Sequence, residues 1–205
     1  MSIGEDIKGA LQDIGTTITI YRDSGNLSGE YIDYEPNAQV TKPFIREFFL
    51  ESMVSYDTNL ISGDAFRLDK TGEDFLLMNK TPVVIENAVS NYDCVLYKCN
   101  VSGEILRPSG EVRSTQTYHK VTSFISVETE CFALMTEPLF SGDLDTDEQL
   151  GLIGMQKNEL YIPKTNGIQV LDRFQPVSGE YYMVDSIKIR RFPGIDVAIL
   201  SEDTR

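Results

Sequence analysis

Residues 177–205 read VSGEYYMVDSIKIRRFPGIDVAILSEDTR, and this stretch predicts a β-hairpin. One arm covers residues 180–187 and the other covers residues 195–200, and both are rich in β-branched and aromatic side chains. Phe192-Pro-Gly194 lies between them, and a turn is expected there because proline fixes φ and glycine accepts positive φ. Since an isolated hairpin is only marginally stable in water, it must pack on further strands.

A related pattern occurs earlier in the chain, in residues 62–99. There Gly72 and Glu73 precede an apolar run that ends at Met78, and a connection leads to Asp93 and a second apolar run. In residues 167–200, Gly179-Glu and Asp196 stand before two similar runs. The shared order predicts an internal duplication of a β unit.

The rest of the chain adds short strand-like runs separated by turn residues. Residues 2–14 predict a short amphipathic helix with Ser2 as its cap, and residues 22–41 predict a polar loop. Residues 160–163 predict a short strand, and its last residue, Pro163, indicates that this strand lies at a sheet edge. The pattern predicts an all-β fold of one or two small β-barrel or sandwich units with a short N-terminal helix. The strand-like runs cover residues 16–21, 44–50, 65–68, 75–78, 81–85, 94–99, 117–135 and 160–163.

The 205 residues are enough for one large domain or two small ones. Residues 101–116 are rich in glycine, proline and serine, which favours an exposed connection. We therefore expect a first β unit with the N-terminal helix in residues 1–100, a connecting loop in residues 101–116, and a second β unit in residues 117–205.

The net charge of −14 disfavours sequence-specific DNA binding, because an acidic surface repels phosphates. It suits either a plain solubilising surface or a passage through which DNA slides. No apolar run approaches the ~20 residues of a membrane span, and the N-terminus lacks the features of a secretory signal. We expect a protein of the cytosol or of a particle assembled there, with three unpaired cysteines.

The sequence gives little sign of catalytic chemistry. His119 is the single histidine, and Cys94 and Cys99 do not have zinc-finger spacing. Residues 143–147 begin like a calcium loop, but Glu148 and Gly154 stand where such loops need glycine and glutamate. We expect no enzyme, no catalytic residue, no metal and no cofactor.

Four arginines stand out in so acidic a chain: Arg107, Arg113, Arg190 and Arg191. The last two, with Phe192, lie at the tip of the predicted hairpin. They are candidates for an interface with a partner or a like subunit, and ordinary surface ion pairs are the alternative.

At the hairpin the chain resembles the head-closure (stopper or head-completion) proteins of long-tailed bacteriophages. The resemblance lies in Gly179–Ile187, in Arg191–Ile195 and in the apolar strand that follows. In the first half, Gly15–Tyr21 and Gly72–Met78 resemble the same family.

The resemblance implies a structural virion protein of the phage neck, the head-tail connector, in a larger and duplicated form. Such proteins form a homo-oligomeric ring below the portal or its adaptor, help to retain packaged DNA, and meet the tail terminator or tail tube. DNA passes through the lumen without sequence readout, no membrane is involved, and the protein is located in a virion assembled in the host cytoplasm. Residues 22–41 or 101–116 would then contact the lumen or a subunit. The alternatives are another tail ring component (tail terminator or baseplate) and a carbohydrate-binding β-sandwich.

Overall fold

The computed structural model describes residues 3–22, 25–35, 49–113, 120–136, 158–176 and 179–205. It contains one helix, α1 (Ile3–Ile14), a short 3₁₀ turn, η1 (Lys164–Asn166), and twelve strands within these ranges. The strands are β1 (Thr16–Ile20), β2 (Leu27–Glu35), β3 (Phe49–Ser55), β4 (Ala65–Leu68), β5 (Asp74–Ile85), β6 (Ala88–Lys98), β7 (Val101–Arg113), β8 (Lys120–Thr136), β9 (Asn158–Pro163), β10 (Arg173–Pro176), β11 (Tyr182–Phe192) and β12 (Ile195–Glu202).

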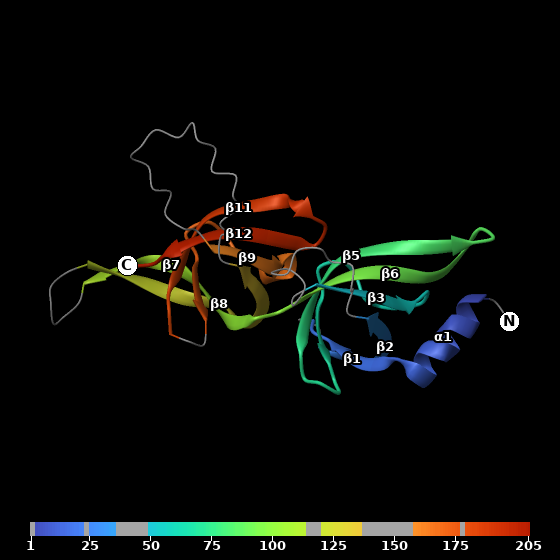
Figure 1. Ribbon diagram of the computed structural model, residues 1–205. Helices are drawn as coiled ribbons and strands as arrows, with labels where there is room; N and C mark the ends of the chain where they lie inside the picture. The colour runs from blue at the N-terminus through green and yellow to red at the C-terminus, as the bar shows by residue number, and fades with distance from the viewer. Residues whose placement is uncertain (1–2, 23–24, 36–48, 114–119, 137–157, 177–178) are drawn as a thin grey trace, which may run out of the picture.

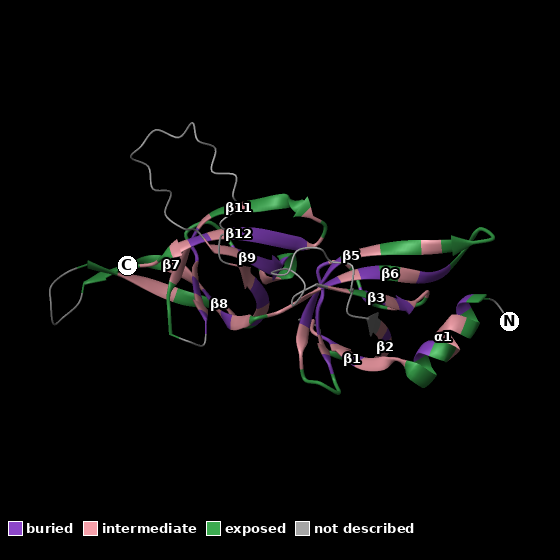
Figure 2. Cartoon of the chain, viewed as in Figure 1, coloured by how far each residue is buried: buried purple, intermediate pink, exposed green. Residues whose placement is uncertain are grey.

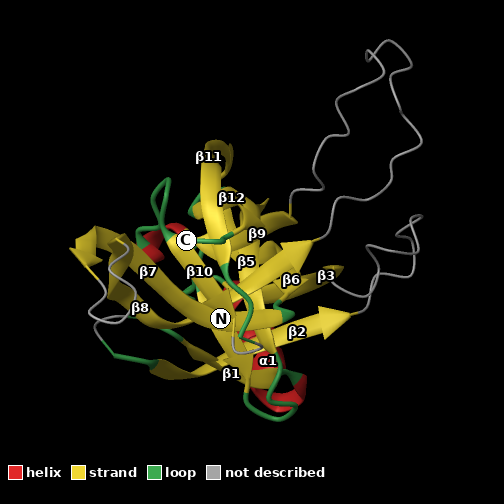
Figure 3. Cartoon of the chain, turned by 90° about the vertical axis from the view of Figure 1, so that its left-hand side faces the viewer, coloured by secondary structure: helices red, strands yellow, loops and turns green. Residues whose placement is uncertain are grey.

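The strands form two closed antiparallel barrels, which confirms the predicted all-β class. The first barrel has the order β1-β2-β3-β6-β5-β4, and the second has the order β10-β11-β12-β9-β8-β7. The barrels lie one after the other along the molecule (Figure 1), and one stands in front of the other when the molecule is seen end-on (Figure 3). Each sheet closes on itself, so neither unit is a sandwich of two open sheets.

The second barrel repeats the first, strand for strand. In chain order the first strand of each barrel pairs with the second and the fourth, the third pairs with the second and the sixth, and the fifth joins the fourth to the sixth. β1 therefore corresponds to β7, β4 to β10, β5 to β11 and β6 to β12. The repeat predicted for residues 62–99 and 167–200 is confirmed by this topology, and it extends over both whole barrels.

The strand register repeats as well as the strand order. Across β1 and β4, Ile20 lies opposite Phe66, and across β7 and β10, Ile105 lies opposite Phe174. All four side chains are fully buried, so equivalent positions supply each core. The pairs Leu77–Leu96 of the first barrel and Val184–Leu200 of the second repeat in the same way.

Each barrel has a core of its own, visible as the buried segments in Figure 2. Alternate residues of a strand point to opposite faces, and the inward set is apolar in both barrels. The first core contains Ile18, Ile20, Ile32, Val54, Leu60, Phe66, Leu68, Phe75, Leu77, Cys94 and Leu96. The second contains Ile105, Cys131, Ala133, Leu160, Ile162, Ile168, Phe174, Val184, Ala198 and Leu200.

A partly buried ion pair fixes the turn before β4. Arg22 donates from Nη2 to Asp64 Oδ2 at 2.7 Å and to the Asn59 carbonyl at 2.8 Å. Asp64 also accepts a bond from the Ile61 amide at 2.9 Å. These bonds span the turn from residue 59 to residue 64 and tie it to Arg22, which lies just after β1.

The second barrel carries the same device before β10. Arg107 donates through Nε and Nη2 to Asp172 at 3.0 and 2.9 Å, and through Nη2 to the Gly167 carbonyl at 2.8 Å. The Gln169 amide donates to Asp172 Oδ2 at 2.8 Å, which matches the Ile61 bond. The two barrels thus share a charged clamp as well as a topology.

Several sequence predictions are corrected by the structure. Residues 101–113 form β7, the first strand of the second barrel, and not a connecting loop; the barrels are joined through Cys99 and Asn100. The pairing of β7 with β8 has three register shifts, at or next to Gly103, Pro108 and Gly110. Such β-bulges allow glycine and proline to lie within a strand. Residues 114–116 lie outside the described ranges.

Two further predictions are wrong in part. The expected polar loop at 22–41 contains β2, whose Ile32 is fully buried and whose Leu27 is exposed. Pro163 is not at a free edge, because β9 pairs with both β8 and β12; the proline is tolerated as the last residue of the strand. The predicted helix is confirmed as α1, and its expected cap, Ser2, lies outside the described residues.

The clamp in the second barrel is testable by substitution. Asp172 is 1% exposed, so Asp172→Ala leaves Arg107 and the Gln169 amide without their acceptor. We expect a loss of about 3 kcal/mol in the free energy of unfolding, measured by urea denaturation. Glu111→Ala on the same strand is the control: its exposed pair with Lys120 predicts a loss below about 1 kcal/mol. Equal losses in the two variants would contradict the structural role of the clamp.

Candidate interaction surfaces

The five residues predicted as an interface have different environments. Arg107 is part of the clamp within the second barrel, where its bond to Asp172 raises its pKa, so it is not available to a partner. Arg113 and Arg190 are exposed. Arg191 pairs with Glu159 at 3.1 Å, and Phe192 packs in the contact between the two barrels. The hairpin tip therefore docks within its own chain.

The barrel–barrel contact is apolar and buried. This contact explains why β5 and β12 carry apolar side chains on both faces. Leu77 and Leu200 face the cores of their own barrels, whereas Leu76 and Val197 face the other barrel. Seven buried residues make the centre of this interbarrel cluster: Ala65, Leu76, Met78, Leu134, Tyr161, Ile195 and Val197.

Aromatic side chains from both barrels border the cluster. The rings of Tyr21 and Phe132 stack at 4.7 Å, one from each barrel. Tyr97 of the first barrel meets Tyr161 of the second edge-on at 6.2 Å, and Phe192 lies 6.0 Å from Tyr161. Such pairs add to the burial of apolar area, so the two barrels behave as one packed body.

Two turns approach each other closely at this contact. Gly63 lies in the turn before β4, and Gly194 lies in the tip between β11 and β12. A Cβ at Gly63 would lie 2.1 Å from the Gly194 carbonyl oxygen, and a Cβ at Gly194 would lie 1.9 Å from the Ser62 carbonyl oxygen. Both have positive φ, at 98° and 74°. Glycine is therefore required at both positions.

An ion pair stands at the edge of the same contact. Arg67 donates through Nε and Nη2 to Asp74 at 2.9 and 3.0 Å, and the Tyr21 hydroxyl donates to Asp74 at 2.8 Å. The Arg67 guanidinium lies 5.7 Å from the Phe132 ring of the other barrel. Burial, followed by the bond to Asp74, raises the Tyr21 pKa. The hydroxyl thus stays protonated and acts as a fixed donor.

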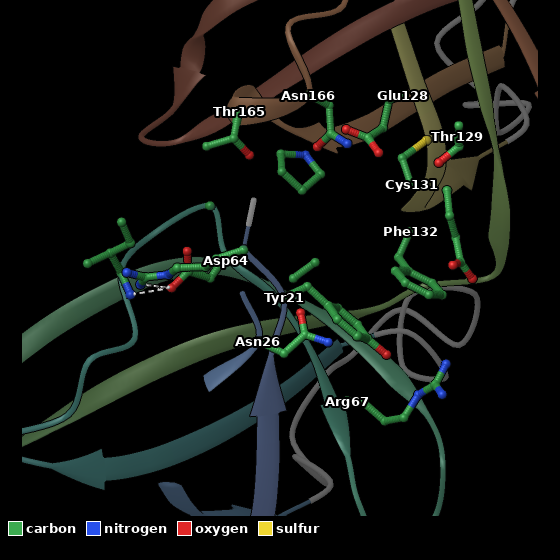
Figure 4. A pocket seen from close by; sticks show the side chains of 16 residues that line it. Tyr21, Asn26, Asp64, Arg67, Glu128, Thr129, Cys131, Phe132, Thr165 and Asn166 are labelled. Carbon is green, nitrogen blue, oxygen red and sulfur yellow. Dashed lines mark hydrogen bonds and ion pairs between the residues drawn. The ribbon is translucent and has the colours of Figure 1, made fainter. Parts of the chain in front are cut away.

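A cleft of about 730 Å³ opens beside the contact. Figure 4 shows Tyr21, Asn26 and Arg67 of the first barrel on one side, and Glu128 and Asn166 of the second on the other. Its arginines are already paired within the first barrel, which leaves an acidic and amide-rich lining.

No reactive constellation forms in the part of the chain that the structure describes. Groups of three or more metal-ligating side chains are absent from those residues. Cys94 and Cys131 are buried, and burial raises the pKa of each thiol to about 12. His119 and the acidic run 143–147 lie outside the described ranges.

The hairpin β5–β6 carries uncovered apolar side chains. Val84, Ile85 and Val89 near its tip are 58%, 39% and 36% exposed. Glu86 and Asn87 form the tip, both with positive φ. This tip lies at the end of the molecule remote from the second barrel, as Figure 1 shows.

A second apolar stripe lies on the ribbon formed by β7 and β8. Val112 pairs with Val121, and both are at least half exposed, as is Ile125. Phe124 points the other way, under the Arg173 guanidinium at 3.9 Å. The ribbon therefore presents one apolar face to solvent, at the end of the molecule opposite the β5–β6 tip (Figure 1).

The C-terminal residues fasten this ribbon to the second barrel. Arg173 donates to Asp203 at 2.7 Å, and Arg205 donates to the other oxygen of the same carboxylate and stands over Phe124. The Asp203 side chain is fully buried, and its two arginine bonds outweigh the effect of burial and hold its pKa well below the usual range.

The sequence reasoning missed the clamp residues Asp64 and Asp172. The signal was present, because Asp64-Ala-Phe66 and Asp172-Arg-Phe174 share an aspartate two residues before a core phenylalanine. The shared aspartate is found when the two repeats are aligned on the sequences of β4 and β10. An alignment on the hairpins does not show it.

The comparisons with known proteins identify no relative: no family model, no curated protein and no solved structure matches this chain. In the described residues, α1 is too short to cross a bilayer, and no longer apolar helix is present.

The glycine contact between the barrels predicts a specific sensitivity. Gly194→Ala adds a methyl group against the Ser62 carbonyl, so the turns must separate. We expect a loss of about 2–3 kcal/mol in the free energy of unfolding and unfolding of the two barrels in separate steps, followed by calorimetry. Gly72→Ala is the matched control, since its φ of 72° is almost the same and its Cβ would meet no atom within 4 Å. A cost of about 1 kcal/mol is expected there. Equal behaviour of the two variants would disprove the role of the contact.

The lowered pKa of Asp203 predicts a pH dependence of stability. Its carboxylate is charged in the folded state at pH values where the unfolded side chain, with a pKa of about 3.9, is already protonated. The stabilisation is therefore complete above about pH 5 and declines as the pH falls below about 4. Asp203→Asn should lower the free energy of unfolding by about 2 kcal/mol at pH 7 and by less at pH 3, measured in urea. A difference that grows on acidification would contradict this assignment.

Proposed function

We propose that this protein is a structural component of a bacteriophage neck, where it joins the portal or its adaptor to the tail and helps to retain packaged DNA. The observation that carries the proposal is the pair of hairpins that expose apolar side chains at the two ends of a body of two packed barrels. Exposed β-branched side chains on two-stranded ribbons are typical of surfaces that are covered on assembly.

Further features support a role in assembly. The interbarrel cluster makes a stiff unit, as a connector between two larger structures requires. The net charge of −14 would let DNA pass a lumen without adhering to its wall. The resemblance of Gly179–Ile187 and Arg191–Ile195 to head-closure proteins points to the same place in the virion.

The proposal assigns a partner to one end of the molecule. The β7–β8 ribbon, with its outward Val112, Val121 and Ile125, would contact a protein of another kind, such as the portal adaptor or the tail terminator. A catalytic role has no such support in the described residues.

The test is a phage in which the gene carries an early stop codon. Electron microscopy of the lysate should show DNA-filled heads without tails, or heads that have lost their DNA, next to free tails. Expression of the protein from a plasmid should restore tailed virions. Complete heads bearing tails of abnormal length or without a baseplate would instead place the protein in a tail ring, and normal tailed virions would overturn both assignments.

A further inference from the structure

The β7–β8 ribbon has a strand edge that no described strand covers. β8 pairs with β7 along its length, but it pairs with β9 only at Leu134–Thr136. Between Lys120 and Ala133, the backbone N–H and C=O groups that point away from β7 therefore have no neighbouring strand among the described residues. Such a row of unpaired groups is a template to which another chain can add a strand.

This edge lacks the features that protect an edge strand from pairing. Residues 121–126 of β8 read VTSFIS, with no charge, no proline and no glycine, and each pairs in regular order with β7. Natural edges are commonly blocked by charged side chains or proline. The parts of β5 and β11 that extend beyond their pairing with β4 and β10 carry such residues: Lys80 and Pro82 on β5, and Lys188 and Arg190 on β11.

The opposite edge of the ribbon, along β7, is blocked. Pro108 has no backbone N–H to donate, and the register shift between Pro108 and Gly110 interrupts the strand. Arg107, on the same strand, is held in its clamp with Asp172. A strand that joins the ribbon is therefore expected beside β8.

The equivalent strand of the first barrel is covered. β2 corresponds to β8, and its Glu30 carboxylate accepts hydrogen bonds from the Thr58 hydroxyl at 2.7 Å and from the Asn59 backbone amide at 3.1 Å. These bonds hold the loop after β3 beside β2. β7 and β8 have 13 and 17 residues, whereas β1 and β2 have 5 and 9. The long ribbon with an open edge is thus specific to the second barrel.

The open edge leads into the cleft between the barrels. β9 runs antiparallel to β8 and leaves it after Pro163, and the cleft of about 730 Å³ opens there, with Asn166 across from Glu128 and Glu130. Figure 4 shows Glu128 and Asn166 at this wall. The arginines of the cleft are paired within the first barrel, whereas Glu128 and Glu130 form no ion pair with a described residue. A basic side chain therefore complements the charge of the cleft.

We propose that β8 binds an extended segment of another protein as an added antiparallel strand, in the line that β9 leaves after Pro163. The N-terminal end of this segment is basic and lies in the cleft beside Glu128 and Glu130. Apolar side chains at alternate positions lie next to Val121 and Ile125, which are 50% and 55% exposed. Main-chain bonds supply the affinity of such a strand, and its alternate side chains supply the specificity.

This inference deepens the proposed function and rests on it in one respect, that the β7–β8 ribbon is a contact surface. It adds the chemistry of the partner, which is a strand-forming segment with a basic start.

Fluorescence anisotropy with labelled synthetic peptides and the full chain tests the edge. The first peptide has two lysines followed by alternating valine and threonine, and binding is expected. A second peptide, with the two lysines moved to the C-terminal end, should bind about fivefold more weakly or less, because its lysines then lie at the ribbon tip, away from Glu128 and Glu130.

Backbone methylation separates strand addition from other contacts. Two further peptides carry N-methyl groups on alternate amides, so that one edge of each has no donor. One of the two should bind and the other should not, since β8 requires the donors of a single edge while the valines lie beside Val121 and Ile125.

Substitutions in the ribbon provide the matched comparison. Val121→Lys and Ile125→Lys should each weaken binding of the first peptide about tenfold or more, because each places a charge beside the added strand. Val112→Lys is the control: it lies on the same face but on β7, away from the open edge, so a change below about twofold is expected. All three positions are at least half exposed, and thermal melting followed by circular dichroism checks that each variant folds.

No binding of the first peptide, equal binding of the two methylated peptides, or equal losses in Val112→Lys and Ile125→Lys would overturn the added strand. None of these results bears on the neck assignment, which the stop-codon phage tests separately. Normal tailed virions in that experiment would overturn the neck assignment and leave the added strand standing.

Discussion

The partly buried ion pair between an arginine and the aspartate just before β4 or β10 is the constraint on which the rest of this structure depends. Asp64 and Asp172 each accept an arginine and the backbone amide three residues earlier, and so fix the shape of a turn. In the first barrel that turn receives Gly194 and aligns the two barrels. In the second it presents Leu171 to solvent. The same kind of ion pair thus shapes the corresponding turn in both barrels.

The apolar contact between the barrels follows from the composition of a few strands. Most strands of a small barrel need one apolar face, but β5 and β12 have two, and the second face is the one that joins the barrels. The Arg67–Asp74 pair and the Tyr21 hydroxyl satisfy the polar groups at its border. The two barrels therefore pack as one body, and exposed apolar side chains lie at both of its ends.

Much of this fold could be predicted from the sequence. The strands that could not be predicted each have a local cause. The C-terminal hairpin, the N-terminal helix and the repeated unit follow from periodicity and from Pro-Gly punctuation. β2 and β7 were missed because glycine, serine and proline occupy outward or bulged positions, and composition alone cannot tell these from a loop. Of the tip residues predicted as an interface with a partner, Arg190 is exposed, Arg191 pairs with Glu159 of its own barrel, and Phe192 packs against the first barrel. The contact of Phe192 lies within the chain, and only the three-dimensional arrangement reveals it.

The central claim is that a close backbone contact, on a turn shaped by the Arg22–Asp64 ion pair, joins the two barrels into one body. Calorimetry of Asp64→Ala measures this most directly, because Asp64 fixes the turn that receives Gly194. The account predicts that the single unfolding transition of the unmodified protein separates into two transitions in this variant. A single transition of unchanged enthalpy in the variant would contradict it.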